Sequence, residues 1–95
     1  MEIELSITEE HLKKGKFRNA TECPIAISLK EYNPEFEYVS TGFIGSNFRL
    51  GEDSYSIRHT PEVKDFIASF DNGKEIKPTT LYLTAKVITF EKEGE

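Results

Sequence analysis

The chain has no tryptophan, a single cysteine and fewer cations than acids. Its uncharged runs, such as residues 23–29 and the longest at 38–48, are much shorter than the roughly 20 apolar residues that a membrane span requires. One cysteine cannot form an internal disulfide, which fits a reducing compartment. The N-terminus has neither a basic start nor an apolar segment, so we expect no secretory signal. These absences predict a cytoplasmic protein without membrane contact.

The charge balance of 17 acidic against 12 basic residues gives a formal net charge of -5. Binding to duplex DNA regardless of its sequence draws most of its affinity from lysine and arginine, so this balance argues against it. Hydrophobic residues make up 37% of the chain, which is too many for a disordered protein. We expect one globular domain over residues 1–90 and a frayed acidic tail over 91–95.

Local patterns predict three helices and about five strands. Strict alternation of apolar and polar residues indicates strands at both ends of the chain, over 2–7 and 79–90. Between them, β-branched and aromatic residues broken by turn formers predict a meander with strands over 36–44, 48–50 and 55–59. Residues 23–32 fit a strand or a helix, and Pro24 favours the helix because proline suits a first helical turn.

The clearest single element is a helix over residues 60–73. Thr60 can cap its free N–H groups, Pro61 suits its first position, and Gly73 supplies the stop. A shorter helix over 8–15 shows the same signals, with a threonine before it and a glycine after it. An apolar stripe runs along the longer helix, formed by Val63, Phe66, Ile67 and Phe70.

These elements in the order β-α-α-β-β-β-α-β indicate an α+β fold. We expect an antiparallel or mixed sheet of about five strands with helices packed on one face. The first and last strands are natural candidates for central positions. The stripe of the longer helix would then lie across Leu5, Leu81 and Leu83.

The sequence contains no constellation typical of an enzyme or a metal site. His11, Cys23 and His59 are scattered, whereas a closed zinc site needs four ligands at short spacings. No Ser/His/Asp set or phosphate-binding glycine loop is evident, so we expect no catalysis, no cofactor and no metal. We predict an exposed His11, a His59 at a strand end and a structural Cys23. A helix N-terminus could lower the pKa of Cys23, which would make it the nucleophile of an enzyme alternative.

One loop combines positive charge with an aromatic side chain. It places four of the twelve basic residues within six positions, with no acid between them. Favourable placement at a helix C-terminus explains the first two lysines without any partner. A binding role remains the alternative, since functional residues concentrate on loops. The candidate binding residues are Lys13, Lys14, Lys16, Phe17 and Arg18.

Two blocks covering about half of the chain resemble a group of small uncharacterised proteins of tailed phages and prophages. The first block is Thr8-x-Glu10-His11-Leu12-x-x-Gly15 followed by Cys23-Pro24-Ile25-Ala26-Ile27, and the second is Phe66-Ile67-x-x-Phe70-Asp71-x-Gly73-x-x-Ile76-x-Pro78. The resemblance implies a phage or prophage origin and a helix from Pro24. It implies no activity.

Taken together, these patterns predict a small, non-enzymatic, phage-encoded binding protein that acts through a macromolecular partner. An inhibitor of a host factor, including an anti-defence protein that occupies a basic surface, fits the net acidity. The alternative is a nucleotide or single-stranded nucleic-acid binder that uses the basic loop at 13–18. A homodimer could also form by pairing of an edge strand.

Overall fold

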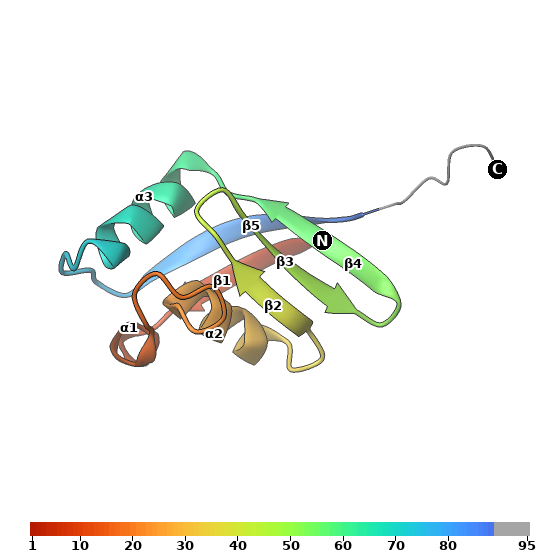
Figure 1. The fold of residues 1–95 in the computed structure, drawn as a ribbon, viewed down its shortest axis with the longest axis horizontal. Coiled ribbons are helices and arrows are strands. Elements are labelled where there is room, and N and C mark those ends of the chain that lie inside the picture. Colours follow the sequence, from red (N-terminus) through yellow and green to blue (C-terminus); the bar gives the residue numbers. More distant parts are fainter. Residues whose placement is uncertain (89–95) are drawn as a thin grey trace.

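The computed structural model describes residues 1–88, so the predicted tail at 91–95 and the last residues of the predicted final strand lie outside it. Its eight elements follow the predicted order, and the α+β fold class is confirmed (Figure 1). The strands are β1 (Glu2–Ile7), β2 (Glu37–Thr41), β3 (Gly45–Leu50), β4 (Asp53–Arg58) and β5 (Thr79–Val87). The helices are α1 (Glu9–Lys14), α2 (Pro24–Tyr32) and α3 (Pro61–Asp71).

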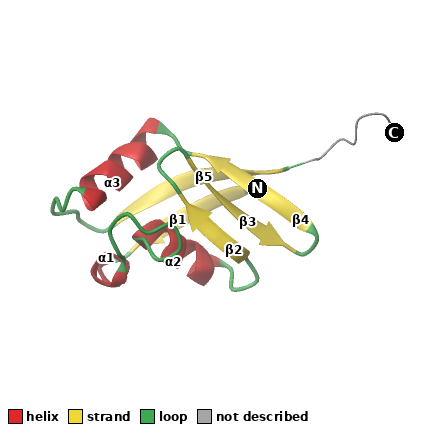
Figure 2. Cartoon of the chain, in the orientation of Figure 1, coloured by secondary structure: helices red, strands yellow, loops and turns green. Residues whose placement is uncertain are grey.

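The five strands form one curled sheet in the order β1-β5-β4-β3-β2, and all neighbours are antiparallel (Figure 2). β5 is an interior strand, as expected: Leu81 pairs with Leu5 of β1, and Ala85 pairs with Ile57 of β4. The prediction that β1 is also central was wrong, because β1 lies at one edge and β2 at the other. Alternation of side chains reports which face of a strand is buried, but it does not report how many neighbours the strand has.

One face of the sheet carries the core. In β1 and β5, alternate residues are buried almost completely, while Glu2, Glu4 and Tyr82 point to the opposite, exposed face. The buried set comprises Ile3, Leu5, Ile7, Leu81, Leu83 and Ala85. This one-sided pattern matches the predicted two-layer arrangement, in which helices cover the apolar face.

α3 begins and ends as its sequence predicts. Thr60 Oγ1 accepts a hydrogen bond from the Val63 N–H (3.4 Å), and Pro61 occupies the first turn. At the other end Gly73 adopts a left-handed φ of 74°, its N–H donates to Phe70 O, and the next N–H donates to Ser69 O. This pair of bonds is a Schellman motif, which satisfies the last carbonyls of the helix.

α2 is a helix, as Pro24 predicts, and it packs against both edge strands. Ile25, Ala26 and Leu29 are completely buried. Ser28 Oγ donates a hydrogen bond to Ser6 O of β1 (3.1 Å), which fixes the helix to that edge. No helix within residues 1–88 is long and apolar enough to cross a membrane.

The meander differs from its prediction at the turn between β2 and β3. β2 ends at Thr41 and β3 already begins at Gly45, so residues 45–47 belong to a strand and not to a turn. Phe43 consequently sits in the turn with 51% of its surface exposed, instead of within the predicted strand over 36–44. A Cβ atom on Gly45 would collide with the carbonyl oxygen of Ile57, so only glycine allows β3 to approach β4 this closely.

Candidate functional site

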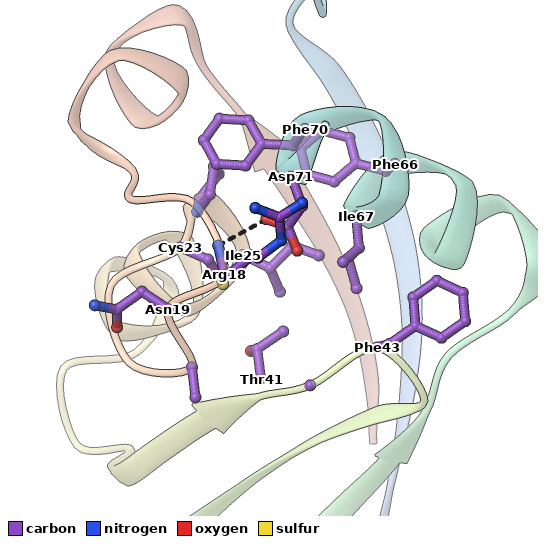
Figure 3. A pocket seen from close by; sticks show the side chains of 13 residues that line it. Arg18, Asn19, Cys23, Ile25, Thr41, Phe43, Phe66, Ile67, Phe70 and Asp71 are labelled. Atoms are coloured by element: carbon purple, nitrogen blue, oxygen red, sulfur yellow. Dashed lines mark hydrogen bonds between the residues drawn. The ribbon is translucent and has the colours of Figure 1, made fainter. Parts of the chain in front are cut away.

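A pocket of about 280 Å³ opens between α3, the N-terminus of α2 and the end of β2 (Figure 3). Its walls are largely apolar, with aromatic and aliphatic side chains from α3 on one side and Cys23 and Ile25 on the other. Thr41 and Gly42 line it at the end of β2. Three separate segments of the chain build this pocket: residues 18–25, 41–43 and 66–71.

Aromatic side chains stand exposed around the pocket. Phe43, which lines it, and the adjacent Ile44 are 51% and 67% exposed. Phe17 is 58% exposed and stacks on Phe70, another lining residue, with their ring centroids 4.9 Å apart. The ammonium nitrogen of Lys64 lies 5.9 Å from the centre of the Phe43 ring. The opening is therefore bordered by apolar side chains that solvent can reach.

Arg18 lies at the border of the pocket in an unusual backbone conformation. Its φ is 49°, which is uncommon for a residue other than glycine, asparagine or aspartate. Its backbone N–H donates to Asp71 Oδ1 of α3 (2.9 Å), and this bond spans 53 positions of the sequence (Figure 3). The contact fixes the loop against α3 and places the Arg18 side chain beside the pocket.

The basic loop predicted from the sequence does not form a continuous positive surface. Only Arg18 lines the pocket, and Phe17 adjoins it through Phe70. The three lysines are exposed and each has a carboxylate neighbour that offsets its charge. These pairs are Lys13 with Glu9 (3.4 Å), Lys14 with Glu10 (3.0 Å) and Lys16 with Glu22 (3.3 Å).

Cys23 caps α2 and forms part of the pocket wall. Its sulfur accepts a hydrogen bond from the Ala26 N–H (3.5 Å), so the expected position at a helix N-terminus is confirmed. Burial nevertheless raises the pKa of the thiol, and this outweighs the backbone N–H groups and the Thr41 hydroxyl, which lower it. The expectation of a lowered pKa was therefore wrong. A raised pKa leaves less thiolate at neutral pH and weakens the case for a nucleophile.

A buried hydrogen-bond network lies directly beneath the Phe43 turn. His59 Nε2 lies 2.7 Å from Ser46 Oγ, and Ser46 Oγ is also bonded to Thr41 Oγ1 (3.0 Å). His59 Nδ1 lies 3.1 Å from the Phe43 carbonyl oxygen. Because a carbonyl can only accept, Nδ1 carries a proton and donates it to the Phe43 carbonyl. The network thus fixes the turn that presents Phe43.

Ser46 and His59 have the spacing of a serine–histidine pair, which the sequence analysis did not detect. Both are almost completely buried, with exposed fractions of 2% and 3%, so a substrate has no direct path to the Ser46 oxygen. Burial lowers the pKa of His59, the positive charge of Lys64 lowers it further, and the bond to the Phe43 carbonyl opposes them. His59 is therefore neutral at pH 7, which suits a structural role at this position.

His11 departs from the prediction of an exposed side chain. It is 5% exposed, its Nδ1 accepts the Thr8 N–H (3.0 Å), and its Nε2 lies 2.7 Å from Glu31 Oε1 of α2. The Thr8 hydroxyl in turn accepts the His11 N–H, so the two residues cap α1 reciprocally. His11 therefore joins the two short helices instead of facing solvent.

Residues 1–88 contain no cluster of three or more side chains suited to holding a metal ion. Comparisons of the chain with models of protein families, with curated proteins and with solved structures find no match in any of the three. The pocket and its aromatic border are therefore interpreted from their own geometry.

Proposed function

We propose that this chain is a small non-enzymatic binding protein, and that its macromolecular partner inserts an apolar side chain into the pocket between α2 and α3. The observation that carries the proposal is an apolar pocket lined by the exposed Phe43, with the exposed Phe17 stacked on the lining residue Phe70. Solvent-exposed apolar groups that gather around a concavity are typical of sites that bind another protein.

The size of the pocket supports a side chain as its occupant. Ligand pockets for drug-sized molecules usually enclose about 300–1,000 Å³. A cavity of about 150 Å³ holds one benzene molecule. The pocket, at about 280 Å³, is larger than the benzene-sized cavity and slightly smaller than a pocket for a drug-sized molecule. It would therefore accept a phenylalanine or leucine side chain. The exposed residues around it would supply the remaining contact area.

The turn that carries Phe43 and Ile44 is braced from below, which supports a role in recognition. Its apolar side chains project outward although burial would stabilise the isolated protein. His59 contacts the turn through two bonds, because its backbone N–H donates to Ile44 O (2.8 Å) and its ring contacts Phe43 O. A turn whose backbone is held in this way loses little backbone conformational entropy when it binds, which favours affinity.

The proposed kind of partner is motivated by the sequence alone. An origin in a phage or prophage, and a host factor or an anti-defence target as the partner, stay predictions that the comparisons do not test. Their motivation is the resemblance of the two sequence blocks together with the net charge of -5. Under this proposal the protein occupies a surface of the host factor and needs no chemistry of its own.

The alternative, a nucleotide or single-stranded nucleic-acid binder, receives less support from the geometry. Stacking on Phe17 beside Arg18 favours it, since aromatic and cationic groups together bind unpaired bases. Glutamates offset the three lysines of the loop, however, which reduces the attraction to phosphates. If this alternative holds, affinity for an oligonucleotide should fall steeply with salt.

The experiment compares the wild-type protein with Phe43→Ser and Tyr82→Ser as baits in lysate of the presumed host cell. Phe43 and Tyr82 are both exposed aromatic residues, but Tyr82 lies on the outer face of β5, away from the pocket. We expect a protein that the wild-type and Tyr82→Ser baits retain and that Phe43→Ser loses. If capture is the same for all three baits, or if no partner is enriched, the proposal is contradicted.

A further inference from the structure

Arg18 is the one cation of the predicted loop that no carboxylate of residues 1–88 pairs with at ion-pair distance. It is exposed, and it is also the one member of that set that lines the pocket. The other three cations are each within 3.4 Å of a glutamate oxygen. Arg18 is therefore distinguished both by its place and by its charge.

The backbone of Arg18 adopts an energetically unfavourable, left-handed conformation. A left-handed conformation is strained for a residue other than glycine, and such strain often marks functional sites. The N–H bond to Asp71 Oδ1 compensates for it and ties the residue to α3. This bond uses the backbone of Arg18, so its guanidinium group keeps its five donors for another acceptor.

We propose that the partner's binding segment is acidic: an apolar anchor side chain that fills the pocket, flanked by an aspartate or glutamate that pairs with Arg18. The inference rests on the proposed function, since it concerns the same pocket. Charge complementarity supports it, because an arginine beside an apolar cavity matches a carboxylate beside an apolar side chain. Arginine is also among the residues most enriched at the centres of protein interfaces.

A second cation, Lys64, lies near Phe43, which lines the pocket. Its ammonium group is directed toward the Phe43 ring, 5.9 Å from the centroid, and no carboxylate of the described residues pairs with it at ion-pair distance. Arg18 thus lines the pocket and Lys64 lies near one of its lining residues, although the net charge of the protein is -5. Asp71 is the acid that lines the pocket, and its Oδ1 atom is occupied by the Arg18 N–H.

The test titrates three capped peptides into the isotopically labelled protein and follows backbone amide signals by NMR. The probes are acetyl-Asp-Phe-Asp-amide, acetyl-Asn-Phe-Asn-amide and acetyl-Asp-Ala-Asp-amide. We expect the first to shift signals from the pocket residues, and the second to bind about threefold more weakly, as an exposed ion pair implies. The third lacks the anchor and should leave these signals unchanged.

Two variants of equal charge separate local pairing from general electrostatics. Arg18→Gln should remove the preference for the Asp peptide, whereas Arg58→Gln, an exposed arginine on β4 outside the pocket, should keep it. Equal binding of the Asp and Asn peptides to the wild-type protein, or equal effects of the two substitutions, would overturn the acidic segment but leave the pocket as a docking site. If neither phenylalanine peptide shifts the pocket signals, the proposed function fails and this inference fails with it.

Discussion

Two groups of aromatic side chains occupy opposite situations in this small protein. On the inner face of β3 and β4, Phe48 lies between Phe36 and Tyr55, with ring centroids 3.8 Å and 5.2 Å away, and it is 2% exposed. Near α3, Phe70 stacks on Phe17, but the pocket opens beside it and Phe17 is 58% exposed. Similar residues thus close the core in one place and leave it open in the other.

The difference shows where side chains in this fold are packed less densely. Protein interiors are normally as dense as organic crystals, and an unfilled space loses the contacts that its lining would otherwise make. In this protein Phe70 borders two hollows, one of them the pocket between α2 and α3, whereas Phe48 borders one and is only 2% exposed. A local packing deficit beside exposed apolar residues is what a docking pocket requires.

The largest loss of stability is expected in the aromatic group of Phe36, Phe48 and Tyr55. Phe48→Ala removes a buried ring that packs between two others, so it should lower the free energy of unfolding by about 3–5 kcal/mol. Urea denaturation followed by circular dichroism measures this loss. A loss below about 1 kcal/mol would mean that the aromatic group on the meander is not a closed part of the core.

A smaller loss is expected from Phe70→Ala on the open side. Phe70 is 7% exposed and borders two hollows, so fewer contacts disappear with its ring. We expect a cost of about 3 kcal/mol, at the lower limit for such truncations. The same urea titration compares it with Phe48→Ala, and equal losses would erase the contrast between the two regions.

The smallest of these effects concerns pH and the network beneath the Phe43 turn. Because burial lowers the pKa of His59, the unfolded chain takes up a proton before the folded one does as the pH falls. The stability from neutral His59 is therefore complete above the ordinary pKa of about 6.5 and declines below it. Urea titrations at pH 7.5 and 5.5 should show this decline.

His59→Gln supplies the control for the pH experiment, because glutamine does not titrate. The variant should lose less stability than the wild-type protein between the two pH values, and the pair of His11 and Glu31 is common to both. Identical slopes would mean that His59 does not bind its proton differently in the two states. The rigidity of the turn that carries Phe43 would then need another explanation.

Elements determined by neighbouring residues could be predicted from the sequence. The ends of α3 were correct because Thr60 and Gly73 act within one turn of the helix. The helical state of residues 24–32 followed in the same way from Pro24. Strand order could not be predicted, since the edge position of β1 depends on pairing with a strand more than 70 residues away.

The pocket could not be predicted because residues from three distant segments form it. Arg18 was selected for its charge, but its bond to Asp71 has no local signal. The burial of His11 depends on Glu31 in another helix, and the burial of His59 depends on Ser46 in the neighbouring strand. The raised pKa of Cys23 reflects surroundings that only the folded chain creates.

The position of α2 limits how a partner can recognise this protein. Open sheets can often accept a foreign strand, because an edge offers unpaired backbone groups. Here the helix lies against both outermost strands, Ser28 occupies the Ser6 carbonyl, and Ala20 O accepts the Thr41 N–H at the other margin. At those positions a partner must therefore contact side chains instead of adding a strand to the sheet. The specificity of such contacts can be changed by single substitutions.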